Sequence, residues 1–170
     1  MQMARLDQRM RRAIARLAGR DDGAVLVEFA LVFPIMLLFF AVIAESSRLL
    51  WSYQMAIEGV RDAGRYLARI APVDICLTGG SVTGYAAELK TIVEEDIGGG
   101  GLFPPMVTVN AVTPAVACVP GSYRTDPAPI ASVSADLTIT FPLGGIFGLF
   151  GSSLTSATTT VTDSSRIYGQ

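Results

Sequence analysis

Glu28 is the residue whose position in this sequence most clearly suggests chemistry. It is the single charged residue in an apolar run of 21 residues, Ala24 to Ala44. A carboxylate in a bilayer costs about 2.5–3.5 kcal/mol near the centre and less toward the edge, so a functional role is the default hypothesis for it. An opposite charge would offset this cost, because charges attract more strongly in a low dielectric than in water. Something is therefore expected to repay the cost of this charge if the run spans a membrane.

The sequence contains no constellation of residues for catalysis. It has no histidine, which excludes His-based triads, proton shuttles and His metal sites. Two cysteines without histidine do not form a zinc site, so we expect no metal and no other cofactor. The acidic residues 94–96 are typical of a solvated helix end. The glycines 98–101 follow a helix and lack the Lys-Ser/Thr of a phosphate-binding loop. We expect a protein that is not an enzyme.

The apolar run Ala24–Ala44 has the length of a membrane span. A helix rises about 1.5 Å per residue, so the run covers roughly 30 Å, the thickness of a bilayer core. A secretory signal peptide has a shorter apolar core of about 7–15 residues, followed by a small-x-small cleavage site. Here Glu45-Ser46-Ser47-Arg48 follows the run instead. We therefore expect the span to stay in the mature protein.

Charge is distributed unevenly about this span. Residues 1–23 hold six arginines and three aspartates, a net charge of +3, whereas residues 24–170 hold seven basic and twelve acidic residues, a net charge of −5. Positive charge beside a span marks its cytoplasmic end, so residues 45–170 are expected outside the inner membrane. The acidic balance of that part argues against nucleic acid as a partner.

Periodicity predicts an α+β fold. Residues 24–70 read as one helix that Pro34 is expected to kink, because proline removes a backbone hydrogen bond. Beyond the span, apolar residues recur at spacings of three and four, which predicts a stripe that packs on another surface: Leu49, Tyr53, Ala56, Val60, Ala63, Leu67 and Ile70. Trp51 and Tyr53 fit either an interfacial anchor or packing on the domain.

The second half of the chain predicts a short helix and then strands. Residues 76–83 read as a loop, and Thr83–Ile97 reads as an amphipathic helix that the four glycines end. Alternation predicts an antiparallel sheet of three to four strands, with strands at 106–113, 132–141 and 154–163. In the first strand Val107, Val109 and Ala111 are expected on one face. Residues 114–129 read as a connection. The apolar loop 142–151 either plugs the core, which we favour, or meets a partner.

Cys76 and Cys118 both lie in the part expected outside the inner membrane. An even number of cysteines in an oxidising compartment permits a disulfide. The required Cα separation is not readable from sequence, so two buried free thiols remain the alternative.

The segment around Glu28 resembles a known processing site. Gly23, four further residues and then Glu28 open the apolar helix, in the order Gly-Ala-Val-Leu-Val-Glu-Phe. This looks like the prepilin-peptidase site of type IV pilins and pseudopilins. The Glu-Phe-Ala-Leu-Val-x-Pro core that ends at Pro34 is similar to TadE-like proteins of tight-adherence (Tad) pilus systems. The likeness covers about residues 19 to 70, and further residues fit that family's pattern: Glu45, Arg48, Ala56, Arg61, Ala63, Gly64 and Arg65.

The resemblance implies a domain plan and roles for the site residues. Residues 1–23 would be a leader that prepilin peptidase cuts off after Gly23. Residues 24–44 would be the transmembrane half of the N-terminal helix, and 45–170 an extracytoplasmic, type IV pilin-like α+β domain. Cleavage would free the amine of Ala24, and Glu28 would pair with that amine in a neighbouring subunit. In the alternative, Glu28 extends to the cytoplasmic headgroups.

The function implied by the resemblance is that of a TadE-like minor pilin or pseudopilin that takes part in assembling an adhesive Tad/Flp pilus. Major pilins of this class are far shorter, which favours a minor role. The expected location is the bacterial inner membrane, crossed once, with a cytoplasmic N-terminus and a periplasmic domain; incorporation into the pilus stays open. Expected partners are prepilin peptidase, other pilus subunits and the inner-membrane assembly platform. The alternatives are a type II secretion pseudopilin, or an uncleaved single-pass membrane protein with a ligand-binding periplasmic domain.

Overall fold

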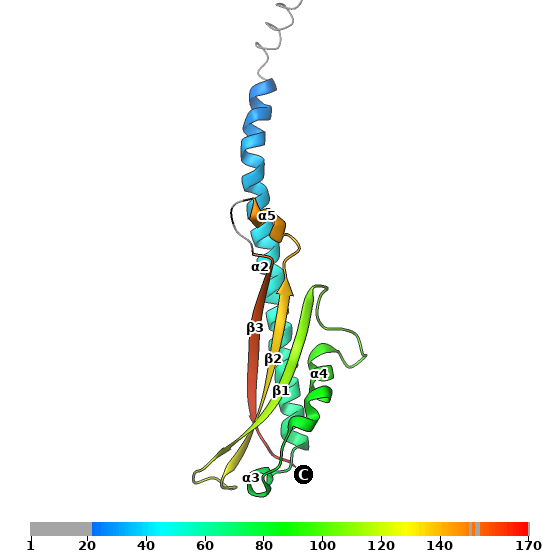
Figure 1. The fold of residues 1–170 in the computed structure, drawn as a ribbon, viewed down its shortest axis with the longest axis vertical. Helices are drawn as coiled ribbons and strands as arrows, with labels where there is room; N and C mark the ends of the chain where they lie inside the picture. Colours follow the sequence, from blue (N-terminus) through cyan, green and yellow to red (C-terminus); the bar gives the residue numbers. More distant parts are fainter. Residues whose placement is uncertain (1–21, 150, 152–153, 170) are drawn as a thin grey trace, which may run out of the picture. The chain divides into compact units, whose positions relative to one another are not determined.

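The computed structural model describes residues 22–149, 151 and 154–169, so all but the last two residues of the expected leader 1–23 lie outside the described part. The chain divides into two compact units, with the boundary between Val42 and Ile43. The first unit contains the start of α2, and the second, the domain, contains the other elements (Figure 1). The elements are α2 (Asp22–Ile70), α3 (Ile75–Thr78), η1 (Thr83–Tyr85), α4 (Ala86–Glu94), β1 (Val107–Val119), β2 (Ala128–Thr140), α5 (Gly144–Gly148) and β3 (Ser156–Arg166).

A long helix, α2, begins the described chain, as predicted, and runs without a break in its helical assignment through Pro34. In the domain its inward stripe is formed by small and aliphatic side chains, all 0–1% exposed: Ala56, Val60, Ala63 and Leu67. Tyr53 is exposed, and Leu49 and Ile70 are only half-buried. The stripe that packs on the domain is therefore shorter than the sequence pattern predicts.

The sheet has three antiparallel strands in the order β1-β2-β3, so the predicted α+β class is confirmed. The central strand, β2, alternates as predicted. Its inward side chains are buried and apolar: Ala131, Val133, Ala135, Leu137 and Ile139. Its other face is polar, and Ser134 and Asp136 hydrogen-bond there to Thr162 and Thr160 of β3. One face of the sheet thus meets the core while the other meets solvent, as is common in antiparallel sheets.

The first strand differs from its prediction in two ways. It continues beyond residue 113 to Val119, through Pro114, because β1 is an edge strand and proline's missing N–H is tolerated there. The register shifts between Val109 and Ala111, so Asn110 is an extra residue. This bulge reverses the alternation. Val112 is buried in place of Ala111, which is exposed, contrary to the predicted pattern.

The second helix is also shorter than predicted. A 3-10 turn precedes α4, and α4 ends at Glu94 rather than Ile97. Asp96 accounts for this early end, because its Oδ1 accepts hydrogen bonds at 2.8 Å from the backbone N–H groups of Gly98 and Gly100. Short acidic side chains compete with helices in this way. Ile97 is consequently fully exposed and does not share the buried face of Leu89 and Val93.

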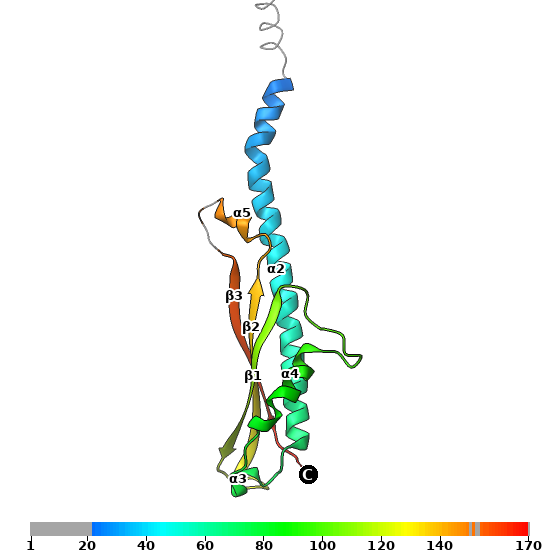
Figure 2. The ribbon, with the colours of Figure 1, turned by 45° about the vertical axis from the view of Figure 1, so that its right-hand side comes forward.

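The core lies between the inward face of the sheet and the two helices α2 and α4, which Figures 1 and 2 show beside β1 and β2. The apolar loop 142–151 contributes in part. It contains the short helix α5, whose Phe147 is buried, whereas Leu149 after it is 82% exposed. The loop therefore fills part of the core, as we favoured, and also presents an apolar side chain outward.

Gly59 of α2 lies close to the backbone of α4. A Cβ at this position would lie 2.9 Å from the carbonyl oxygen of Val93, whereas a Cβ at Gly64 would meet Asp163 Oδ2 at 3.4 Å, an ordinary contact. We expect Gly59→Ala to lower the free energy of unfolding by about 1–3 kcal/mol through overpacking. The matched variant Gly64→Ala should be neutral or stabilising by up to about 1 kcal/mol, since alanine favours a helix. Urea unfolding of the full chain in detergent micelles measures both values, and equal effects would contradict this packing.

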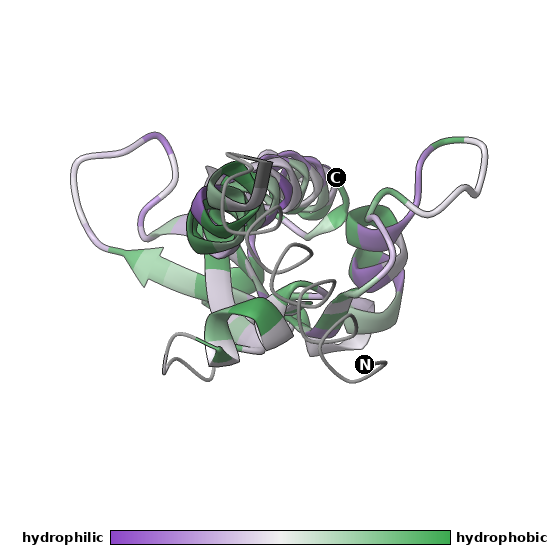
Figure 3. Ribbon diagram, turned by 90° about the horizontal axis from the view of Figure 1, so that it is seen from above, coloured by the Kyte–Doolittle hydropathy of each residue, from purple (hydrophilic) through white to green (hydrophobic). Residues whose placement is uncertain are grey.

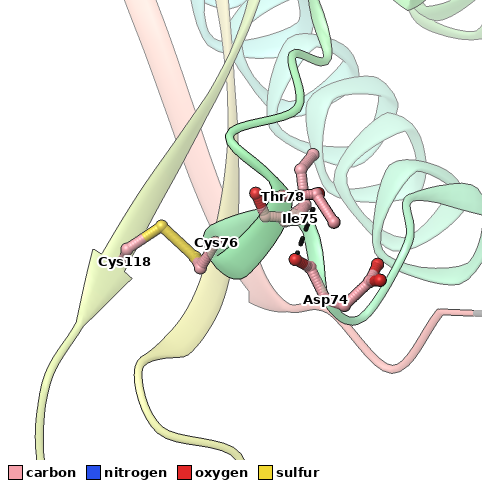
Figure 4. Close-up of a disulfide and its surroundings, with 5 residues drawn as sticks. All are labelled: Asp74, Ile75, Cys76, Thr78 and Cys118. Atoms are coloured by element: carbon pink, nitrogen blue, oxygen red, sulfur yellow. Dashed lines mark hydrogen bonds between the residues drawn. A yellow bond between two sulfur atoms is a disulfide. The ribbon is translucent and has the colours of Figure 1, made fainter.

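A disulfide joins Cys76 of α3 to Cys118 of β1, with Cα atoms 5.7 Å apart (Figure 4). The segment expected as loop, 76–83, begins inside this short helix, where Thr78 Oγ1 donates to the carbonyl oxygen of Asp74 at 3.2 Å. The bond ties the connection that follows α2 to the edge strand of the sheet.

Removal of this disulfide should destabilise the domain. It spans 42 residues, and loop-closure entropy then predicts a stabilisation of roughly 3–4 kcal/mol. We expect the double variant Cys76→Ser/Cys118→Ser to unfold with a free energy lower by about that amount. Alkylation of native, unreduced protein should find no free thiol, and full labelling of both cysteines would contradict the bond.

Candidate membrane anchor and assembly site

The first part of α2 has the composition of a membrane span. The helix Gly23–Ile70 contains an 18-residue stretch whose mean hydropathy is 2.7, and only 6% of that stretch is buried. A core helix of a soluble protein would be mostly buried; here the large apolar side chains are exposed, among them Leu26, Leu31, Phe39 and Phe40. Figure 3 colours this part of the helix hydrophobic. By length and composition this helix is a candidate membrane anchor.

Gly23 lies in the first turn of α2, and a Cβ at this position would meet nothing within 4 Å. Ala24 follows it in the same exposed turn. Glycine in a helix interior costs about 1 kcal/mol relative to alanine. Close packing among the described residues does not require a glycine at this position.

Glu28 is exposed on the same helix, one turn after Ala24. Residues one turn apart share a helix face, and side chains lean toward the N-terminus, so the carboxylate leans toward the Ala24 end. Within residues 22–149, 151 and 154–169, no hydrogen bond or ion pair joins the Glu28 carboxylate to another side chain. Phe29 and Phe33 stack beside it, with ring centroids 5.2 Å apart. Pro34 lies inside the helix, and the expected kink stays a prediction.

Glu45 directly follows the apolar run, and the sequence predicted no contact for it inside the domain. The structure buries it: the residue is 4% exposed, and its Oε1 accepts a 2.6 Å hydrogen bond from the backbone N–H of Leu143. Its Oε2 is buried without a hydrogen-bond partner among the described residues. No sequence signal reveals this contact, because the partner is a main-chain group 98 residues away.

A second feature of the domain is an open groove of about 620 Å³ between α2 and α4. Its lining includes Glu58, Asp62 and Arg65 from α2, and Glu95 and Ile97 from the segment that follows α4. Beside it, the hydroxyl of Tyr66 donates to Glu88. This hydrogen bond, aided by desolvation and the negative charge of Glu88, raises the pKa of Tyr66 above its ordinary value.

The first helix is similar in sequence to a known protein family. The model of the family described as TadE-like protein matches residues 23–65. Over these residues the chain is TadE-like. No curated protein and no solved structure matches the chain significantly.

The TadE-like match begins at Gly23 and ends at Arg65, so it contains Glu28, Pro34 and Glu45. It lies within α2 and does not reach the sheet or the disulfide. The family indicates a Tad pilus-associated protein and an association with pilus components and the membrane. The suspected resemblance to TadE-like proteins is therefore confirmed over residues 23–65, while the domain after residue 65 is described by its structure alone.

Proposed function

We propose that this TadE-like chain is a minor pilin or pseudopilin that is cut after Gly23 by prepilin peptidase and then takes part in assembling a Tad/Flp pilus. One observation carries the proposal: an exposed apolar helix has Gly23 in its first turn, where the family match also begins, and carries Glu28 five residues later. A peptidase that needs a glycine would give this residue a role, since packing does not require a glycine at this position.

The proposed location is the bacterial inner membrane, with residues 24–44 as the span. The arginine-rich residues 1–23 favour a cytoplasmic N-terminus, which puts residues 45–170 in the periplasm. The Cys76–Cys118 disulfide fits that oxidising compartment. The proposed partners are prepilin peptidase, other pilus subunits and the inner-membrane assembly platform, and the proposed role is structural rather than enzymatic.

Glu28 supplies the proposed assembly contact. After cleavage, its carboxylate would pair with the Ala24 amine of a neighbouring subunit. In a low dielectric this pair offsets the desolvation that each charge suffers alone, and it sets the axial register of adjacent helices. The pairing also gives a reason for a charge in a span that is otherwise apolar.

The intact mass of the protein from membranes tests the proposal, in cells with and without the cognate peptidase. We expect a chain that begins at Ala24 in the first case and the full-length chain in the second. Co-purification should recover other Tad subunits; recovery of a type II secretion complex instead would favour that class of pseudopilin. Retention of residues 1–23 with the peptidase present would identify an uncleaved membrane protein.

A further inference from the structure

Four exposed apolar residues of the domain lie on α2 soon after the apolar run and on the segment after α5. Leu50 and Trp51 of α2 are 64% and 66% exposed, and Leu149 and Leu154, on either side of the turn after α5, are 82% and 49% exposed. In Figures 1 and 2, α5 lies beside α2 at the end of the sheet opposite α3. Single exposed apolar residues need no explanation, but a group of them indicates an interaction surface.

Glu45 determines the level of this loop along α2. It is the first charged residue after the apolar run, one residue beyond Ala44, and its carboxylate holds the N–H of Leu143 at 2.6 Å. The base of the loop is compact as well, because a Cβ at Gly144 would lie 2.7 Å from the carbonyl oxygen of Leu154. The loop is therefore held at the level where the apolar run ends, at the expense of a buried carboxylate oxygen without a described partner.

Leu50 and Trp51 follow Glu45 on α2 by five and six residues. Trp51 is six residues beyond Glu45, about 9 Å along the helix axis, and the interfacial layer outside the hydrocarbon core is roughly 5–8 Å thick. Helical side chains lean toward the N-terminus, which brings the indole back toward that layer. Tryptophan is enriched at such interfaces because one end of the ring is apolar and the other can hydrogen-bond.

We infer that Leu50, Trp51, Leu149 and Leu154 form an interfacial collar that seats the domain on the outer leaflet of the membrane, with Glu45 as the residue that positions the α5 loop. The partner is a lipid surface, because the collar directly follows the apolar run. This inference rests on the membrane anchoring in the proposed function but not on cleavage or on pilus assembly.

Tryptophan fluorescence of the full chain in lipid vesicles tests the collar. Trp51 is the only tryptophan, so the fluorescence of the unmodified protein reports on the surroundings of position 51. In a Trp51→Phe background, Leu149→Trp is then compared with Leu77→Trp, a matched exposed leucine (68%) on α3 at the other end of the domain. We expect lipids brominated near the headgroup to quench most of the emission from positions 51 and 149, and aqueous iodide to quench position 77 alone.

The outcomes separate this inference from the proposed function. Carbonate extraction that removes the protein from the vesicles would overturn both the anchor and the collar. A chain that resists carbonate but in which iodide quenches positions 51 and 149 as strongly as 77 would overturn the collar alone. Shielding of positions 51 and 149 from both quenchers would also overturn it, because a protein rather than lipid would then cover the surface. If the substituted chains fail to fold, wild-type Trp51 emission that headgroup-brominated lipid leaves unquenched would overturn the collar.

Discussion

Gly23→Val should abolish processing, so that the full-length chain accumulates in the membrane. The physical reason is that a peptidase site built around a glycine has no room for a branched side chain, whereas the folded chain has room for one. A Cβ at Gly23 meets nothing within 4 Å, and valine is a slightly better helix former than glycine. Loss of cleavage could not then be attributed to a damaged helix. Intact mass spectrometry of the membrane fraction measures the ratio of cut to uncut chain.

The control for Gly23→Val is Ala30→Val, which adds bulk to an exposed position of the same helix seven residues later. It should be cut as completely as the wild-type chain. If Gly23→Val were cut normally, the glycine would not be the recognition element and the proposed processing site would be wrong. If both variants stayed uncut, general disturbance of the helix would explain the result.

Glu28→Gln should reduce assembly while leaving cleavage and folding intact. Glutamine keeps the shape of the side chain but removes its charge, so the pair with the neighbouring Ala24 amine is lost. Insertion should become easier, because the charge costs about 2.5–3.5 kcal/mol near the bilayer centre and less toward the edge. Co-purification with other pilus subunits, and adhesion, should fall. Glu28→Asp should be intermediate, because it keeps the charge and shortens the reach by one methylene.

A matched control for this prediction is Glu94→Gln, which makes the same change on the surface of the domain. Glu94 pairs with Lys90 at 3.6 Å, and exposed pairs of this kind contribute little, so we expect no effect on assembly. Normal pull-down with Glu28→Gln would show that the carboxylate extends to the headgroups or pairs with the amine of its own chain, one turn away. Cleavage and membrane level, measured on the same samples, separate an assembly defect from a processing defect.

The parts of the fold that were predictable depend on local periodicity. The long helix, the second helix and the three strands all follow from spacings of three to four or of two, as in Val133, Ala135 and Leu137 of β2. Element ends were less predictable, because single polar contacts determine them. Asp96 ends α4 early, and the bulge at Asn110 reverses the face of β1. Neither the Asp96 contacts nor the extra residue in a strand pair leaves a periodic signal.

The sequence by itself determined the candidate membrane segment, the Gly23–Glu28 pattern and the resemblance of the first helix to TadE-like proteins. Those features lie within a short stretch of the chain, and they are readable from sequence because composition and spacing depend only on neighbouring residues. Only the tertiary structure decided that Cys76 faces Cys118 and that Glu45 is buried against Leu143. The partners of these two contacts are 42 and 98 residues apart, so they meet only once the sheet has packed on α2. The position of the α5 loop beside the end of the apolar run depends on the same packing.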